Sequence, residues 1–260
     1  MSNEQNTQEQ HEKIIKNMLG FVLLKDANLD WPRFFKELRE KWHLDVSDDE
    51  VKDGSVVLRI NDMLVACSLM PSPVPDHEAE NNAKNSVMWT NAAEEVAKHQ
   101  AHCMIAIMSK NGTPTDQAKL FAKVAASMLI LKNAIGIYKF PTCYPCDFYL
   151  KTAEVMQHGE FPTPIAVHVG MYLTEGGKMN AYTTGMQFFG KDEFEVVGTL
   201  AQPGYLYSFM ISVAEYLITE DETLRPGETI GFTEEQKLPL TKSPGAALPI
   251  ETIKIGLMQG

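Results

Sequence analysis

Residues 19–42 read LGFVLLKDANLDWPRFFKELREKW, a short apolar run followed by a segment with helical spacing. The run from Leu19 to Leu24 is too short for a helix and is bounded by polar residues, which is typical of a buried strand. Beyond Asp30, a favourable helix cap, large apolar residues recur on one helical face. These are Trp31, Phe34, Phe35, Leu38 and Trp42. The sequence therefore predicts a strand and then an amphipathic helix that ends near His43.

The next segments continue this order. Strands are predicted over 55–60 and 63–69, and Asn61-Asp62 between them favours a tight hairpin. The prolines within 70–75 exclude a continuing central strand, because each removes a backbone donor. A helix over 87–98 and a strand over 102–108 follow. The order strand, helix, strand, strand, helix, strand is typical of a split βαβ, ferredoxin-like unit.

The second half shows a similar order. The pattern predicts a linking helix capped at Thr115, a helix from about Cys146 and another over 203–218. Strands are predicted over 134–138, 165–173, 179–188, 229–232 and 252–257. We therefore predict an α+β fold of two tandem ferredoxin-like (βαββαβ) units, whose antiparallel sheets are covered by helices. The expected parts are a disordered tail over 1–13, a first unit over 14–110, and a second unit over 111–260 with the linking helix and a C-terminal hairpin, packed as one globular body.

Composition restricts the function classes. The chain has 260 residues, with 34 acidic and 23 basic side chains and a formal charge of -11. An acidic chain without clustered Lys and Arg is not expected to bind nucleic acid, whereas its surface suits a basic protein partner. No apolar run approaches the roughly 20 residues of a membrane span. The polar start and four cysteines lead us to expect a cytoplasmic protein with reduced thiols, and we expect neither a cofactor nor a metal.

The sharpest chemical motif is Cys143-Tyr144-Pro145-Cys146. It follows a predicted strand and opens a predicted helix, where the helix dipole can lower the pKa of a thiol. Cys143 would then act as the attacking thiolate and Cys146 as the resolving thiol. A single such motif is more often structural, so a thiol-disulfide oxidoreductase is the alternative function.

Four other residues are candidates for binding a partner or ligand. His168 and Tyr172 share the half-polar face of the 165–173 strand, which is either lightly covered or part of a site. Glu193 and Glu195 are two residues apart and so on one strand face, and the charges beside them favour an exposed rim. His99 and His102 form an HxxH pattern at a helix-to-strand junction, for which a structural role is favoured over a metal site.

Several segments together resemble the bacterial domain of unknown function 4261. They are residues 70–75 (MPSPVP), Trp89 with 99–102 (HQAH), 185–195 (GMQFFGKDEFE) and 229–239 (TIGFTEEQKLP). The resemblance covers most of the chain after the tail and is strongest in the last third. It brings no catalytic residues, substrate or cofactor with it, and the family pattern does not require the two cysteines. Related domains with a Gly-x-x-x-Phe-Gly-x-x-Glu segment occur among immunity-type proteins of bacterial toxin systems, which implies partner binding by analogy.

The first functional hypothesis is therefore a non-enzymatic, immunity-like binding protein whose acidic surface occludes a basic partner. The thiol oxidoreductase is the second. A third is an enzyme with a site between the two units near His168 and Tyr172.

Overall fold

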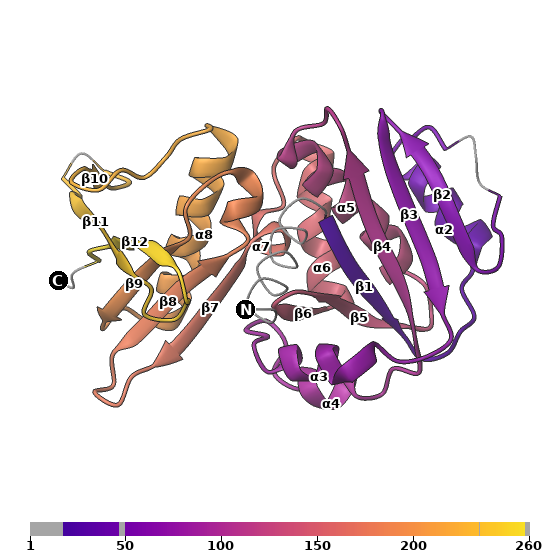
Figure 1. The fold of residues 1–260 in the computed structure, drawn as a ribbon, viewed down its shortest axis with the longest axis horizontal. Helices are drawn as coiled ribbons and strands as arrows, with labels where there is room; N and C mark the ends of the chain where they lie inside the picture. The colour runs from indigo at the N-terminus through magenta and orange to yellow at the C-terminus, as the bar shows by residue number, and fades with distance from the viewer. Residues whose placement is uncertain (1–17, 47–49, 234, 258–260) are drawn as a thin grey trace, which may run out of the picture. The chain divides into compact units, whose positions relative to one another are not determined.

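The chain folds into two compact units, Met1–Ile165 and Ala166–Gly260, called unit 1 and unit 2 below (Figure 1). The structure is a computed structural model, and it describes residues 18–46, 50–233 and 235–257. Each unit contains one six-stranded sheet with helices, so the α+β class is confirmed. The division expected after residue 110 falls inside unit 1. The tail predicted over 1–13 lies outside the described residues.

The sheet of unit 1 has the strand order β2-β3-β4-β1-β5-β6, and all neighbouring strands are antiparallel. The hairpin between β2 and β3 forms at Asn61-Asp62, where both residues have positive φ angles, as such tight turns require. The strands are β1 (Met18–Leu24), β2 (Ser55–Ile60), β3 (Met63–Met70), β4 (Ala101–Ser109), β5 (Ala134–Lys139) and β6 (Thr142–Pro145).

Helices cover the two faces of this sheet unequally (Figure 1). On one face α5 packs over β1, β4 and β5, and Gly20 of β1 leaves room for the ring of Phe121. The opposite face is covered at its β5–β6 end by α3 and α4. The helices are α2 (Trp31–Glu40), α3 (Glu78–Ala83), α4 (Ala92–Val96), α5 (Pro114–Leu129), α6 (Cys146–Ala153) and α7 (Thr163–Ala166), with 3-10 turns η1 (Pro75–His77) and η2 (Glu154–His158).

Unit 2 is built on a sheet of order β10-β11-β12-β9-β8-β7. Its strands are antiparallel except for β12 and β9, which run parallel, so the sheet is mixed. The apolar helix α8 (Pro203–Thr219) packs on one face. The strands are β7 (His168–Leu173), β8 (Met179–Thr184), β9 (Phe194–Thr199), β10 (Thr229–Ile230), β11 (Leu238–Pro244) and β12 (Glu251–Ile255), with a 3-10 turn η3 (Met186–Phe189).

The tandem ferredoxin-like arrangement is not confirmed. In a split βαβ unit, one strand separates the two parallel strands that a helix connects. Here two strands, β4 and β3, lie between β1 and β2, and the successive antiparallel pairings make β1 and β2 antiparallel. The expected order of elements is largely present in unit 1, but order along the chain does not determine which strands become neighbours.

Other differences concern element boundaries. The helix predicted over 87–98 is reduced to α4, and α3 precedes it. The cap of α5 is Thr113, whose hydroxyl accepts from the Asp116 N–H at 3.1 Å, rather than Thr115. The strand predicted over 165–173 begins at His168, after α7. Strands β6 and β11 were not predicted as strands, and β9 was expected only through the strand face assigned to Glu193 and Glu195.

Candidate functional site

One face of the unit 2 sheet carries most of the predicted binding residues. Gly170, Tyr182, Glu195 and Lys254 are register partners across β7, β8, β9 and β12. Partners directly opposite each other share a face, and residues two apart on a strand do too. Helix α8 packs on the other side. We call this surface the polar face; it comprises His168, Tyr172, Asn180, Tyr182, Glu195 and Lys254.

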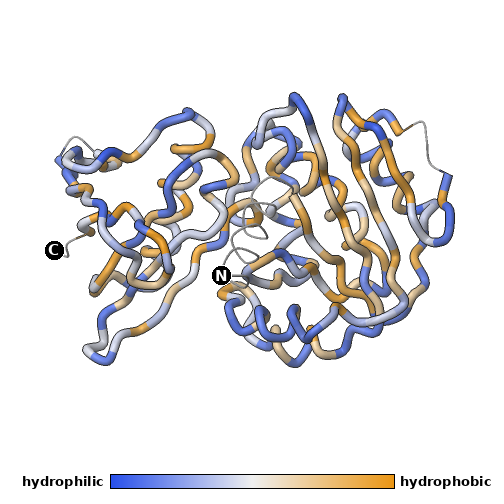
Figure 2. Tube along the Cα trace, viewed as in Figure 1, coloured by the Kyte–Doolittle hydropathy of each residue, from blue (hydrophilic) through white to orange (hydrophobic). Residues whose placement is uncertain are grey.

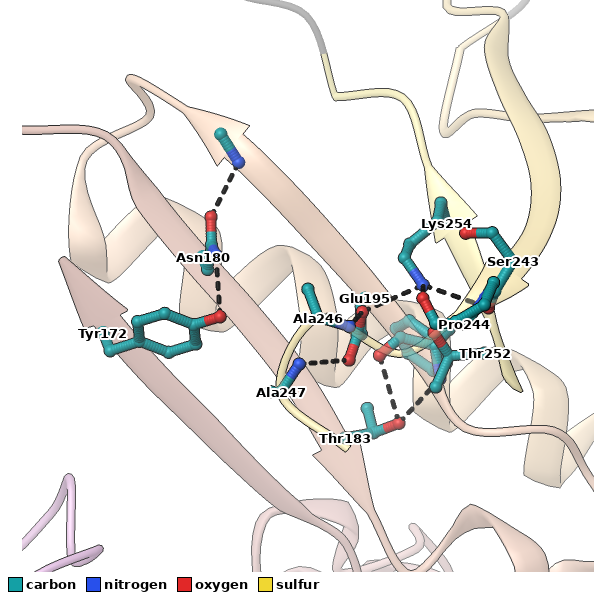
Figure 3. A network of polar contacts seen from close by, with 12 residues as sticks. Tyr172, Asn180, Thr183, Glu195, Ser243, Pro244, Ala246, Ala247, Thr252 and Lys254 are labelled. Carbon is teal, nitrogen blue, oxygen red and sulfur yellow. Dashed lines mark hydrogen bonds and ion pairs between the residues drawn. The ribbon is translucent and has the colours of Figure 1, made fainter. Parts of the chain in front are cut away.

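Glu195 lies within a hydrogen-bonded network on the polar face, as Figure 3 shows. It is 1% exposed, and its carboxylate accepts from the N–H groups of Ala246 and Ala247 at 2.9 and 3.1 Å. Lys254 Nζ lies 3.0 Å from Oε2. Burial opposes ionisation, but the two N–H groups and Lys254 outweigh it and lower the pKa of Glu195. The carboxylate is therefore charged and fully engaged.

Lys254 extends this network to the end of β11. Its ammonium donates to the Pro244 carbonyl at 3.0 Å and to the Thr252 hydroxyl (Figure 3). The network therefore holds the 244–247 connection against β9 and β12. Such a network stabilises the packing of strands and does not form a catalytic site.

Glu193 has a different role, because its carboxylate caps the turn η3. It accepts from the Thr183 hydroxyl at 2.7 Å and from the N–H groups of Gly185 and Gln187 at 2.8 and 3.3 Å. Burial raises the pKa of Glu193, although these donors oppose the rise. Thr183 is adjacent to Tyr182 on β8 and so faces the opposite side from the polar face. The expectation that Glu193 and Glu195 share a strand face is therefore wrong: Glu193 precedes β9, outside the regular alternation.

The neighbouring charges form ion pairs in which Asp192 and Asp221 remain exposed. Lys191 Nζ lies 2.6 Å from Asp221 just beyond α8, and Asp192 lies 2.9 Å from Lys242 of β11. Glu193 and Glu195 are 4% and 1% exposed, so the interpretation of these two residues as solvated is wrong. The segment 191–195 instead links β9 to the end of α8, to β11, to η3 and to β12.

Tyr172 and His168 lie where the alternation predicts. The Tyr172 hydroxyl accepts from Asn180 Nδ2 at 2.8 Å, and Asn180 Oδ1 accepts from the Gly198 N–H, which joins three strands (Figure 3). Tyr172 remains 37% exposed, whereas His168 is buried and its ring lies 6.2 Å from that of Tyr182. The Tyr182 ring covers Gly170, where a Cβ atom would come within 2.2 Å of it.

The two cysteines of the 143–146 motif occupy the expected strand-to-helix junction. Cys143 lies in β6 and Cys146 is the first residue of α6. Burial raises the pKa of the Cys143 thiol, and the nearby Glu80 carboxylate adds to the rise. Burial also raises the pKa of Cys146, to about 11. Both shifts are opposite to those of an activated thiolate. All four cysteines are free thiols.

The HxxH histidines hold the proline-rich segment. His99 accepts from the Val74 N–H at 2.9 Å and donates to the Val96 carbonyl at 2.6 Å. His102 donates to the Ser72 carbonyl at 2.8 Å. The sequence analysis did not predict this role. The prolines of the 70–75 segment prevent regular strand pairing, so the remaining N–H and C=O groups of that segment need side-chain partners. Within the described part of the chain, no group of three or more His, Cys, Asp or Glu residues is arranged to hold a metal ion.

A second surface of unit 2 combines aromatic and acidic side chains. Tyr205 and Phe232 are 54% and 53% exposed, and their rings lie 6.5 and 5.7 Å from that of the buried Phe209 between them. Exposed carboxylates flank Phe232 in the chain, at Glu235 and at Glu228, whose Oε1 lies 3.6 Å from Arg225 Nη1. We call Tyr205, Phe232, Glu228 and Glu235 the aromatic–acidic patch. In the described ranges, no helix is both long and apolar enough to cross a bilayer.

The comparisons with known proteins agree with the resemblance noted above. The sequence model of a family described as a domain of unknown function (DUF4261) matches residues 182–256. No curated protein and no solved structure matches the chain. The match contains Glu193, Glu195 and Lys254, and the segments over 70–75 and 99–102 lie outside it. The resemblance to the DUF4261 family is thus confirmed over the part of unit 2 that contains the buried Glu195–Lys254 ion pair and the hydrogen bonds of Glu193.

Proposed function

We propose that the chain is a non-enzymatic, immunity-like protein that binds and occludes a basic partner protein through the aromatic–acidic patch. The observation that carries this proposal is the exposure of Tyr205 and Phe232 on either side of Phe209, with Glu228 and Glu235 close to Phe232 in the chain. Exposed aromatic side chains are enriched at the centres of protein interfaces, where they contribute large contact areas.

Charge supports a basic partner. Residues 166–260 contain 12 acidic and 6 basic side chains, so unit 2 contributes strongly to the formal charge of -11. Two of those acids, Glu193 and Glu195, are buried and accept hydrogen bonds within unit 2. The negative electrostatic potential at the surface therefore comes from the remaining acidic residues. An acidic field speeds encounter with a basic protein and weakens as salt rises.

The proposal places the protein in the cytoplasm. Its four free cysteines support this location, because thiols stay reduced in that compartment.

A salt-dependent capture experiment with the full chain tests the proposal. The immobilised protein is exposed to extracts of its source cells at low and high salt, and the retained proteins are identified by mass spectrometry. We expect a basic protein to be retained at low salt and released at high salt. Its retention should fall at least tenfold for the variant Tyr205→Ala/Phe232→Ala and for Glu228→Lys/Glu235→Lys.

The matched control is Glu94→Lys, an exposed glutamate of α4 in unit 1. This variant has a smaller charge change but leaves the patch intact, so it should retain the partner. Retention that is equal in all variants, or the absence of any salt-sensitive partner, contradicts the proposal.

A further inference from the structure

The sheet of unit 1 has an apolar face that its described helices leave partly open. Register partners place Val57, Ala66, Ala106 and Leu19 in one row across β2, β3, β4 and β1. The rows on either side add further apolar residues. We call this surface the outer face; it comprises Leu19, Phe21, Val57, Leu64, Ala66, Ser68, Met104, Ala106 and Met108.

The two sides of these strands differ in burial. Val56, Leu58 and Val65, which alternate with the outer residues, are at most 2% exposed on the side of α5. On the outer face Val57 is 58% exposed, Met108 38% and Leu19 37%. Figure 1 shows α3 and α4 at the β5–β6 end only, and Figure 2 shows the strands of this sheet as largely hydrophobic. Contiguous apolar surface of this kind is typical of a binding site.

The size of the outer face decides between possible occupants. Four strands spaced about 4.8 Å apart are roughly 19 Å wide, and three side-chain rows extend roughly 20 Å along them. The area is thus about 400 Å², half of the roughly 800 Å² that each partner contributes to a standard interface, so the face suits a single docked element rather than a whole second copy. A helix of about 14 residues is roughly 21 Å long and fits this length.

The chemistry of the face also suits a helix. Alanines occupy the centre of the Val57–Leu19 row, so an incoming backbone can approach closely there. Met104 and Met108 flank them and can adapt their shape to bulky side chains. Arg59 and Lys110 are exposed at one end of the face, where the described part of the chain places one acid, Asp62.

We propose that the outer face binds one amphipathic helix of a partner protein. Its apolar stripe covers the alanine row, and its carboxylates lie toward Arg59 and Lys110. The inference goes beyond the proposed function, because it concerns the other unit and a different surface.

The test uses the full chain and a fluorescein-labelled 14-residue helical peptide, with leucines on one face and glutamates on the other. A scrambled peptide of the same composition is the reference, and fluorescence anisotropy measures both affinities. We expect the amphipathic peptide to bind at least tenfold more tightly than the scrambled one. Ala106→Glu should weaken its binding at least tenfold.

Val57→Glu is a second variant that keeps the test decisive, because Val57 is exposed on an edge strand and its replacement leaves the core intact. The matched control is Val197→Glu, at an exposed valine of β9 in unit 2, which should leave the affinity unchanged. Equal binding of the two peptides, or binding that neither outer-face variant weakens, overturns the proposal. So does a dimer in sedimentation that Val57→Glu dissociates, or binding of the chain to phosphatidylcholine vesicles that Val57→Glu abolishes.

Discussion

Lys254 Nζ lies 3.0 Å from Glu195 Oε2, across the parallel pairing of β12 with β9. This pairing joins the two halves of the unit 2 sheet, β7-β8-β9 and β10-β11-β12. The ion pair therefore lies where the two halves of the sheet meet. The N–H groups of Ala246 and Ala247 are the other hydrogen-bond donors to the carboxylate. The stability of unit 2 should depend on it.

Replacing Lys254 by methionine tests this dependence. The change leaves a buried carboxylate without its countercharge, and breaking a buried ion pair in this way costs about 3–5 kcal/mol. We expect Lys254→Met to lower the free energy of unfolding of unit 2 by about this amount. Hydrogen exchange of the β9 and β12 amides measures it, since all three tryptophans lie in unit 1.

The double variant Glu195→Gln/Lys254→Met separates the pair from its neighbours. It should cost less than the sum of the single changes, because neither partner is left charged and buried. Lys237→Met, at an exposed lysine of unit 2, is the control and should have little effect. Additive single effects would show that the two side chains do not act as a pair.

Glu193 predicts a pH dependence of the opposite sign to that of an ordinary ion-paired acid. Because burial raises its pKa above 4.5, the folded state binds more protons than the unfolded state between pH 4.5 and the raised pKa. The free energy of unfolding of unit 2 should therefore fall as pH increases through this window. Glu193→Gln should remove that fall when hydrogen exchange is compared across the window, and Glu175→Gln, at an exposed site, should retain it. An unchanged slope in Glu193→Gln would contradict the prediction.

The sequence predicted those parts of the fold in which a local pattern determines the structure. The apolar run before Lys25 and the spacing from Trp31 to Leu38 correspond to β1 and α2, and the Asn61-Asp62 turn joins β2 to β3. Beyond this hairpin, the local patterns did not determine which strands are neighbours, because β1 pairs with β4 and β5 through contacts far apart in the chain.

The candidate site shows the same limit. Alternation correctly placed His168 and Tyr172 on one face of a strand. The expectation that Glu193 and Glu195 are exposed was wrong. Charged residues are almost never fully buried unless they are paired, so the sequence alone favoured exposure. Their partners are as distant as Lys254 and Ala246, and no local pattern reveals them.

His102 predicts that unit 1 loses stability in mild acid. Burial lowers the pKa of His102 from 6.5, although the bond to the Ser72 carbonyl opposes the shift. The unfolded state then binds the proton first, so the free energy of unfolding should be constant above about pH 6.5 and fall below it. Urea titrations followed by tryptophan fluorescence report on unit 1 and measure this slope.

A matched pair of variants identifies the residue responsible. His102→Asn keeps a donor for the Ser72 carbonyl but does not titrate, so it should make the slope below about pH 6.5 shallower. His77→Asn is the control, because the His77 side chain is 85% exposed. A slope that His102→Asn leaves unchanged would assign the acid sensitivity to other groups.

The cysteine motif offers the sharpest test between binding protein and thiol oxidoreductase. Since the pKa of Cys146 is raised from 9.0 to about 11, its thiolate fraction near neutral pH should be about a hundredfold below that of an ordinary cysteine. The buried Cys143 should react still more slowly. Iodoacetamide labelling of the native chain, with peptide mapping and a Cys146→Ser variant to assign the sites, measures both rates. Labelling of Cys143 as fast as a free cysteine would favour the oxidoreductase, because an attacking thiol must be accessible as a thiolate.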